Sequence, residues 1–366
     1  MSRVSDFSLH TQPIYVQWLG LIALAGASGQ LLKYWNIPAA LFLGPMLVAI
    51  AFGVCGASIR LHKQAFRIGQ GFVGMLVAHA MTVSVLATVA HSWHFMLFAT
   101  VLTILLSSVV GLVLVRYAGF DGSTAAWGTS PGAASAMVAM SEESGADSRV
   151  VATMQYVRVV CVVMLGALVS HLIGADTGVA VAQVSAAVSL GSDWLSIALS
   201  VLAIVVGVGL SSRIPAGALL LPLLIGSALQ LSGLLQINLP HWLLAFAYGA
   251  IGCYIGLRFD RPAVLYVWRR LPAMILGSLL LILLCSLSAW LLAEWMNKDF
   301  LSVYLATSPG GLDSMAIIAM DTHSDVGFVL AMQTLRLFGV IVSGGFFARQ
   351  IIRLTEKKTA AVSVTH

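Results

Sequence analysis

The chain has 366 residues, of which 59% are hydrophobic and only 9% charged, with a formal net charge of +5. Soluble domains carry about 25% charged residues, so this composition excludes a soluble protein and indicates an integral membrane protein. The net charge does not point to nucleic acid, because the basic residues lie in short loops rather than on one face or tail.

Apolar segments of about membrane-spanning length follow one another along the chain, five in each half. They cover 14–32, 37–57, 68–88, 94–115 and 150–173, and then 194–212, 215–235, 241–257, 272–296 and 326–348. Between the fourth and fifth segment of each half lies a shorter apolar run, 125–140 or 303–320. Each shorter run carries a Thr-Ser-Pro-Gly break and ends in acidic residues. These elements predict an all-α polytopic membrane protein.

The chain contains the same unit twice. The first copy of its most specific motif comprises Thr129-Ser130-Pro131-Gly132, Met154-Gln155 and Arg158, and the second, 178 positions later, comprises Thr307-Ser308-Pro309-Gly310, Met332-Gln333 and Arg336. Further pairs are Ile37-Pro38-Ala39 with Ile214-Pro215-Ala216, Gly71 with Gly249, and Gly74 with Gly252. Small residues at such spacing favour close helix packing. We therefore expect two repeats, residues 1–175 and 190–352.

Charge asymmetry sets the expected orientation. If the N-terminus is cytoplasmic and each shorter run is a re-entrant hairpin, nearly all Lys and Arg residues fall on the cytoplasmic side. If the shorter runs span the membrane instead, Arg149, Arg213 and the basic cluster 258–270 move outside. We therefore expect five spans and one re-entrant hairpin per repeat, with both termini cytoplasmic. Because five is odd, the second repeat would be inverted, as in many secondary transporters of the inner membrane.

Two arginines fall near the middle of predicted spans. A mid-span Arg costs about 2.5–3.5 kcal/mol on insertion scales and should face a cavity or a counter-charge. Two roles stay open for Arg158 and Arg336: binding backbone carbonyls at a hairpin tip, or holding an anionic substrate or a coupling carboxylate. Gln155 and Gln333 lie three residues earlier, on the same helix face as each Arg.

The Ser-Pro-Gly breaks, 130–132 and 308–310, complete the predicted site. Pro-Gly interrupts the backbone, and a Ser or Thr is a favourable N-cap for the helix that follows. A helix N-terminus at membrane depth offers free amides and a positive dipole end to an anion. The copies differ at Asp313, where the first copy has Ser135. Asp313 either binds a proton or Na⁺, or pairs with Arg336.

The remaining acids and histidines suggest no chemistry of their own. Glu143, Asp147, Asp321 and Asp325 are expected in the aqueous turns that close the hairpins. Among the nine histidines only His91 and His94 are close together, and no nucleotide-binding, metalloprotease or nucleophile motif occurs. The four cysteines, Cys55, Cys161, Cys253 and Cys285, lack metal or disulfide spacing. We therefore expect no enzyme activity, no cofactor and no bound metal.

The duplicated TSPG…MQxxR unit, the IPAxxxLxP segment and the GxxG helix resemble the AbrB family of bacterial inner-membrane proteins. The resemblance covers nearly the whole chain, and the double motif is specific. Members of that family carry the labels "regulator" and "ammonia monooxygenase". The chain is similar, more distantly, to inverted-repeat transporters with crossed broken helices, such as cation/proton antiporters and bile-acid symporters. It has none of the features of the small DNA-binding regulator of Bacillus that shares the family's name.

The favoured function is secondary transport or export of a small anionic solute by alternating access. The alternative is a membrane-embedded regulator or sensor that acts on gene expression through a partner, and the monooxygenase label is the least favoured. Expected partners are a small solute or ion and the lipid bilayer, without nucleic acid, and a homodimer stays open.

Overall fold

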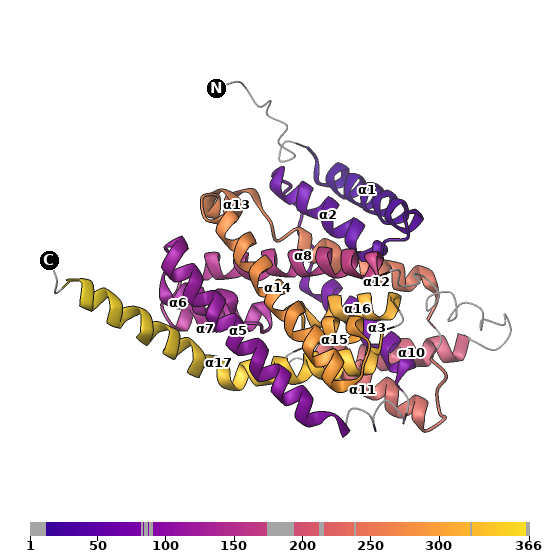
Figure 1. Cartoon of the computed structure of the whole chain (residues 1–366). Helices are drawn as coiled ribbons and strands as arrows, with labels where there is room; N and C mark the ends of the chain where they lie inside the picture. The colour runs from indigo at the N-terminus through magenta and orange to yellow at the C-terminus, as the bar shows by residue number, and fades with distance from the viewer. Residues whose placement is uncertain are drawn as a thin grey trace. The chain divides into compact units, whose positions relative to one another are not determined.

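The computed structural model describes residues 12–81, 83, 87, 91–173, 194–211, 216–237, 239–322 and 324–363. All of the secondary-structure elements in these residues are helices, and no strand occurs among them (Figure 1). The all-α expectation is therefore confirmed.

The helices follow the predicted segments closely. In chain order they are α1 (Ile14–Tyr34), α2 (Ala40–Val54), α3 (Lys63–Ala80), α5 (Trp93–Ala118), α6 (Gly122–Thr129), α7 (Ala134–Glu143), α8 (Ser148–Leu172), α10 (Trp194–Leu210), α11 (Gly217–Leu231), α12 (His241–Gly256), α13 (Arg261–Val267), α14 (Leu271–Met296), α15 (Phe300–Thr307), α16 (Leu312–Asp321) and α17 (Val326–Ser363). Sequence reasoning did not predict α13, which lies in the basic loop between two expected spans.

Helix boundaries repeat along the chain as the sequence motifs do. Helices α5 and α14, α6 and α15, and α7 and α16 begin and end 178 positions apart. The caps repeat as well: Asp121 accepts the Thr124 amide at 3.4 Å before α6, and Asp299 accepts the Ser302 amide at 2.7 Å before α15. An Asp N-cap satisfies a free amide of the first turn. The duplication is thus present in the local structure, while the inversion of the second copy stays a prediction.

The chain divides into two compact units, and each unit takes matching parts of both copies. Unit 1 comprises Met1–Thr82, Ala167–Tyr266 and Met320–His323. Unit 2 comprises Val83–Gly166, Val267–Ala319 and Ser324–His366. Both Thr-Ser-Pro-Gly breaks, both arginines and Asp313 belong to unit 2. The candidate site can therefore be described within one unit.

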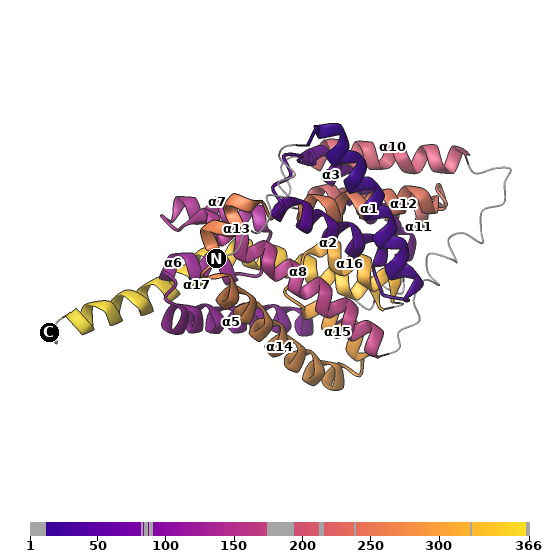
Figure 2. The same cartoon turned by 90° about the horizontal axis from the view of Figure 1, so that it is seen from above.

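Unit 1 is built by reciprocal packing of the two copies. Helix α2 packs on α12 and α3 packs on α11, while α1 covers α2 and α10 covers α11 and α3 (Figure 2). A Cβ on Gly74 would overlap the Leu219 carbonyl oxygen, and a Cβ on Gly252 would lie 2.5 Å from the Phe42 carbonyl oxygen. Equivalent glycines thus meet equivalent carbonyls of the other copy, as in a two-fold interface. The packing role expected for Gly74 and Gly252 is confirmed, whereas a Cβ on Gly249 would meet only Pro45 Cγ at 3.9 Å, so for Gly249 the expectation is wrong.

This close packing predicts a stability difference between two glycines of one helix. Gly252→Ala should lower the apparent unfolding temperature, because overpacking against backbone costs about 1–3 kcal/mol. Gly249→Ala is the matched control, since a Cβ there meets only Pro45 Cγ at 3.9 Å. Thermal unfolding of the purified variants, followed by size-exclusion chromatography, measures both. Equal unfolding temperatures for the two variants would contradict the close contact.

Several of the described helices are long and apolar enough to cross a membrane. Helices α1, α5, α8 and α14 meet this condition, and a fifth span results if Trp242–Gly256 and Arg261–Val267, bent by 49°, form one. Shorter apolar helices are Ala40–Val54, Ser196–Leu210, Gly217–Leu231 and Val326–Val340. The helices are thus compatible with a multi-pass membrane protein. The full count of ten spans stays a prediction.

Candidate functional site

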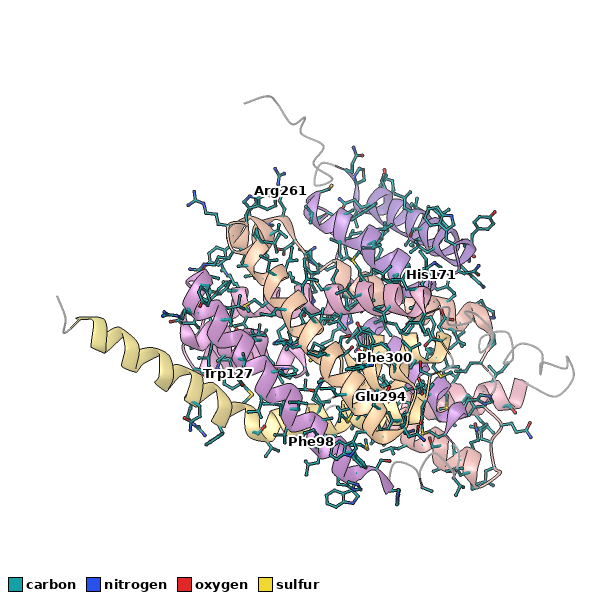
Figure 3. The ribbon with its side chains drawn as sticks, in the orientation of Figure 1. Phe98, Trp127, His171, Arg261, Glu294 and Phe300 are labelled. Carbon is teal, nitrogen blue, oxygen red and sulfur yellow. The ribbon has the colours of Figure 1, made fainter. Side chains whose placement is uncertain are left out.

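Each sequence motif of unit 2 forms two short helices separated by a break. Helix α6 ends at Thr129 and α7 begins at Ala134, while α15 ends at Thr307 and α16 begins at Leu312. Pro-Gly interrupts each helix, because Pro supplies no amide to the preceding turn and Gly tolerates a sharp change of direction. Trp127 on α6 and Phe300 on α15 are labelled in Figure 3.

The hydroxyl groups at the breaks do not cap the following helices, so that expectation is wrong. Ser130 Oγ donates to the Ala126 carbonyl at 2.8 Å, and Ser308 Oγ donates to the Tyr304 carbonyl at 2.7 Å. Both bonds run back into the preceding helix, which Ser can do at a helix end. The residue before α7 is Ala133, whose side chain makes no cap. The first amides of α7 therefore have no side-chain cap from that position.

Arg158 holds the first break through its terminal nitrogens. Its Nη1 donates to the Ser130 carbonyl at 2.7 Å and to the Thr129 carbonyl at 3.4 Å, and its Nη2 donates to Gln155 Oε1 at 2.7 Å. These carbonyls are among those that a broken helix leaves without an amide partner. Arg158 thus adds a charged donor to two backbone acceptors, which also accept bonds from Ser107 and from Gln155.

Arg336 holds the second break in the same way. Its Nη1 donates to the Ser308 carbonyl, while its Nη2 donates to the Gly310 carbonyl at 2.8 Å and to Gln333 Oε1 at 2.6 Å. Of the two roles that the sequence left open for each Arg, these contacts show the carbonyl-binding role. None of these hydrogen bonds of Arg336 goes to Asp313. Asp313 lies half-buried in the first turn of α16.

The glutamines complete each arrangement. Gln155 Nε2 donates to the carbonyls of Trp127, Gly128 and Ser130 at 2.9, 3.2 and 3.0 Å. In the second copy Gln333 Nε2 donates to the carbonyls of Leu305 and Ser308 at 2.8 and 3.1 Å. We call each Gln and Arg pair, 155 with 158 and 333 with 336, a Gln-Arg clamp. The same-face placement predicted for these pairs is confirmed.

The clamps bury positive charge without a carboxylate partner. Arg158 is 3% exposed and Arg336 is 5% exposed. All hydrogen bonds of the two guanidinium groups go to neutral oxygens, and in the described part of the chain neither forms an ion pair. The Nε atom of each is buried and has no hydrogen-bond partner. A buried cation with an unused donor is rare in proteins.

The two copies also pack on each other reciprocally in unit 2. A Cβ on Gly132 would lie 3.1 Å from Val340 Cγ1, and a Cβ on Gly310 would lie 3.0 Å from Val162 Cγ1. Each valine follows the clamp Arg of its own helix by four residues, so it lies one turn further along the same face. Each break therefore rests on the helix that carries the other copy's clamp. Helix α17 also packs on α6 and on α15.

One residue pair on the flanking helices was missed from the sequence. Ser107 on α5 and Cys285 on α14 occupy equivalent positions 178 apart, and Ser107 Oγ donates to the Thr129 carbonyl at 2.6 Å. Cys285 is fully buried, and its thiol lies within electrostatic reach of Arg158 and Arg336. A search for polar residues at the repeat spacing would have found this pair.

The acids predicted in the turns have mixed roles. Asp147 Oδ1 accepts the amides of Arg149 and Val150 at 3.1 and 3.2 Å, so it caps α8. Asp325 Oδ1 accepts the Phe328 amide at 3.0 Å and so caps α17.

Two other acids of this set are placed differently from the caps. Asp321, at the end of α16, accepts the Ala39 amide at 2.7 Å, and Ala39 has a left-handed backbone with φ of +57°. The side chain of Glu143 lies outside the described residues.

The acid at the start of the first hairpin is held in its charged form. The Ser123 hydroxyl, the main cause, and the amides of Ser123 and Thr124 donate to Asp121 and lower the pKa of its carboxyl below the ordinary value. This favours an ionised N-cap on α6. No group of three or more His, Cys, Asp or Glu that could hold a metal is found in the described ranges.

Comparison with known proteins gives consistent matches along the chain. The family model described as "Transition state regulatory protein AbrB" matches residues 41–352. The chain is 43% identical over 327 residues to the "Putative regulator AbrB" of Escherichia coli strain K12, covering 89% of this chain and 93% of that protein. It is 26% identical over 374 residues to the "Uncharacterized protein YhjN" of Bacillus subtilis strain 168, covering 95% and 96%. No solved structure matches the chain.

Proposed function

The chain belongs to the AbrB family, and we propose that it is a secondary transporter that moves a small anionic solute across the inner membrane by alternating access. The observation that carries this proposal is the pair of buried guanidinium groups, each lacking a carboxylate partner in the described chain. In a medium of low dielectric constant such charges attract an anion strongly.

The arrangement of broken helices supports transport rather than a static anion site. Each copy contributes one broken hairpin and one Gln-Arg clamp to unit 2, and equivalent parts of both copies form unit 1 separately. In transporters with inverted repeats, discontinuous helices bind the solute while one unit moves against the other. The proposal is therefore that unit 2 carries the solute.

Reconstitution of the purified protein in liposomes tests the proposal. Uptake or exchange of radiolabelled acetate, succinate or phosphate that saturates with concentration and needs no soluble partner is expected. Empty liposomes and liposomes with the heat-denatured protein are the controls. Transport of no solute in a protein that remains folded would contradict the function.

A regulatory function is the second candidate, because the similar protein of Escherichia coli is named a regulator. A membrane-embedded sensor would bind the same anion and pass its signal to a partner without moving the solute. Binding of an anion combined with no transport in liposomes would favour this candidate. The printed names of the relatives indicate no enzyme, and the monooxygenase label gains no support from the described residues.

The proposed topology places both ends of the first hairpin on the cytoplasmic side. Cysteines introduced at Ser123 and Ser144, before and after the break, should therefore react with an impermeant maleimide in inside-out vesicles. Ser144 is exposed, whereas neighbouring Gly145 has a φ of +70° that a Cys would strain. A Cys at exposed Glu294, near the end of α14, should react only from the opposite side. Labelling of the first pair from different sides would exclude a re-entrant hairpin.

A further inference from the structure

Helices α5 and α14, which are equivalent in the two copies, run antiparallel within unit 2. Phe95, near the start of α5, packs edge-on against Trp295, near the end of α14, with 4.9 Å between the ring centroids. Towards the other end of the pair, a Cβ on Gly277 of α14 would lie 3.0 Å from the Leu114 side chain of α5. The two helices pack side by side (Figures 1 and 2). We call this pair the α5–α14 wall.

The middle of the α5–α14 wall exposes a continuous aliphatic face. Among the described helices long enough to cross a membrane, α5 and α14 are the most apolar. Aliphatic side chains that are 38–66% exposed recur every fourth residue, which places them on one face of each helix. They are Leu97, Val101 and Leu105 on α5, and Leu279, Leu283 and Leu287 on α14. Each helix has 26 residues and is about 39 Å long, so its ends extend beyond a hydrocarbon core of about 30 Å.

One end of the wall is aromatic. Trp93 and Trp295 are 60% and 63% exposed. Trp295 also packs edge-on against Phe98, which is labelled in Figure 3, with 5.9 Å between the ring centroids. Exposed Trp side chains are typical of the interface between membrane and water. The nearby Lys298 is already paired with Asp325 at 2.7 Å, so this end offers aromatic rings rather than available positive charge.

The opposite end of the wall is basic. Arg116 lies in the last turn of α5, while Arg269 and Arg270 directly precede α14, and all three are exposed. The guanidinium group of Arg270 lies 5.4 Å from the ring centroid of Phe120, two residues after α5 ends, so these arginines share one end of the wall. In the described part of the chain none of the three forms an ion pair. Trp268 beside them is 63% exposed.

We propose that this basic end binds the headgroups of anionic phospholipids, with Arg116, Arg269 and Arg270 on the phosphate and the acyl chains along the aliphatic face. A guanidinium group donates two parallel bonds to a phosphate, and the exposed rings of Tyr117 and Trp268 suit the headgroup region. A zwitterionic headgroup carries its own cation, so it offers less to three arginines than an anionic one does. The inference rests on the membrane placement of α5 and α14 and not on the proposed transport.

A second copy of the chain fits this surface less well than lipid does. In a two-fold dimer with both copies in the same membrane orientation, equivalent residues lie near each other across the axis. A dimer through the aliphatic face would therefore bring the basic end of one copy towards the basic end of the other. The repulsion between like charges disfavours that arrangement, whereas the anionic lipids of the cytoplasmic leaflet attract the same arginines.

Phosphatidylglycerol and phosphatidylcholine with identical acyl chains are the probes, added to the delipidated full chain in detergent and followed by thermal unfolding. The wild type should bind phosphatidylglycerol about tenfold more tightly or better, and the double variant Arg116→Gln/Arg269→Gln should reduce this preference to about twofold or less. Lys33→Gln/Arg261→Gln removes two exposed positive charges elsewhere, so it is the matched control and should keep the preference. Equal affinities for the two lipids in the wild type, or equal losses in both double variants, would overturn the site.

Photo-crosslinking tests the same surface with every arginine in place. Benzoylphenylalanine is introduced at Tyr117 in the basic end or at Leu105 in the aliphatic face, both of which are exposed. The protein is irradiated in vesicles that contain phosphatidylethanolamine in excess over phosphatidylglycerol, and adducts are identified by mass spectrometry. Position 117 should give phosphatidylglycerol adducts above the share of that lipid, and position 105 should give adducts of both lipids. Adducts at position 117 in proportion to composition, or crosslinked dimers at position 105, would overturn the proposal.

Discussion

Arg336→Lys is expected to lower the apparent unfolding temperature of the protein by roughly 1–4 °C, even without any solute. One ammonium group cannot replace a fork that donates to the carbonyls of Ser308 and Gly310 and to Gln333. At least one buried acceptor then loses its donor, at a cost of about 1–3 kcal/mol. Thermal unfolding in detergent measures the change, and Arg158→Lys should behave in the same way.

Arg261→Lys is the matched control for this charge-conserving change, because Arg261 is exposed on α13 (Figure 3). Its unfolding temperature should stay within about one degree of the wild-type value, as surface substitutions usually do. An Arg336→Lys variant that is as stable as the wild type but no longer binds acetate or phosphate would contradict the clamp. The fork of Arg336 would then serve the solute rather than the break.

The helices and the two breaks could be predicted from the sequence because their signals are local. The apolar runs 94–115 and 272–296 predicted the first residue of α5 and of α14 to within one position and the last residue to within three. Pro131 and Pro309 marked the breaks. The Gln-Arg pairs were also predictable, since a spacing of three residues places both side chains on one helix face. Each of these inferences needs only the residues of one segment.

Features that depend on long-range packing or on backbone angles could not be predicted. The hydroxyls of Ser130 and Ser308 donate to carbonyls of the preceding helix rather than capping the next one. The backbone conformation at the break, rather than the residue type, decides which partner a hydroxyl reaches. The Lys298–Asp325 ion pair, at 2.7 Å, joins residues whose sequence spacing gives no signal. The grouping of both copies into each compact unit likewise depends on contacts between distant segments.

Asp313→Asn is expected to abolish solute accumulation driven by a proton or Na⁺ gradient. Asp313 is the acid by which the second hairpin differs from the first, and it lies in the first turn of α16 beside the second break. An Asn side chain neither carries charge nor exchanges a proton, so it cannot couple the ion to the solute. The accumulation ratio in liposomes should fall to about one, while exchange of internal for external solute, which needs no net ion movement, continues.

Asp299→Asn is the matched control on the same hairpin. Asp299 caps α15, and Asn is nearly as good an N-cap as Asp, so accumulation should persist in that variant. The competing structural role predicts a different result for Asp313. A carboxylate in a first turn stabilises the helix through its dipole by about 0.3–1 kcal/mol, and its replacement by Asn would lower stability slightly without changing coupling. Full gradient-driven accumulation by a slightly less stable Asp313→Asn protein would therefore assign Asp313 to the helix and require another group to bind the ion.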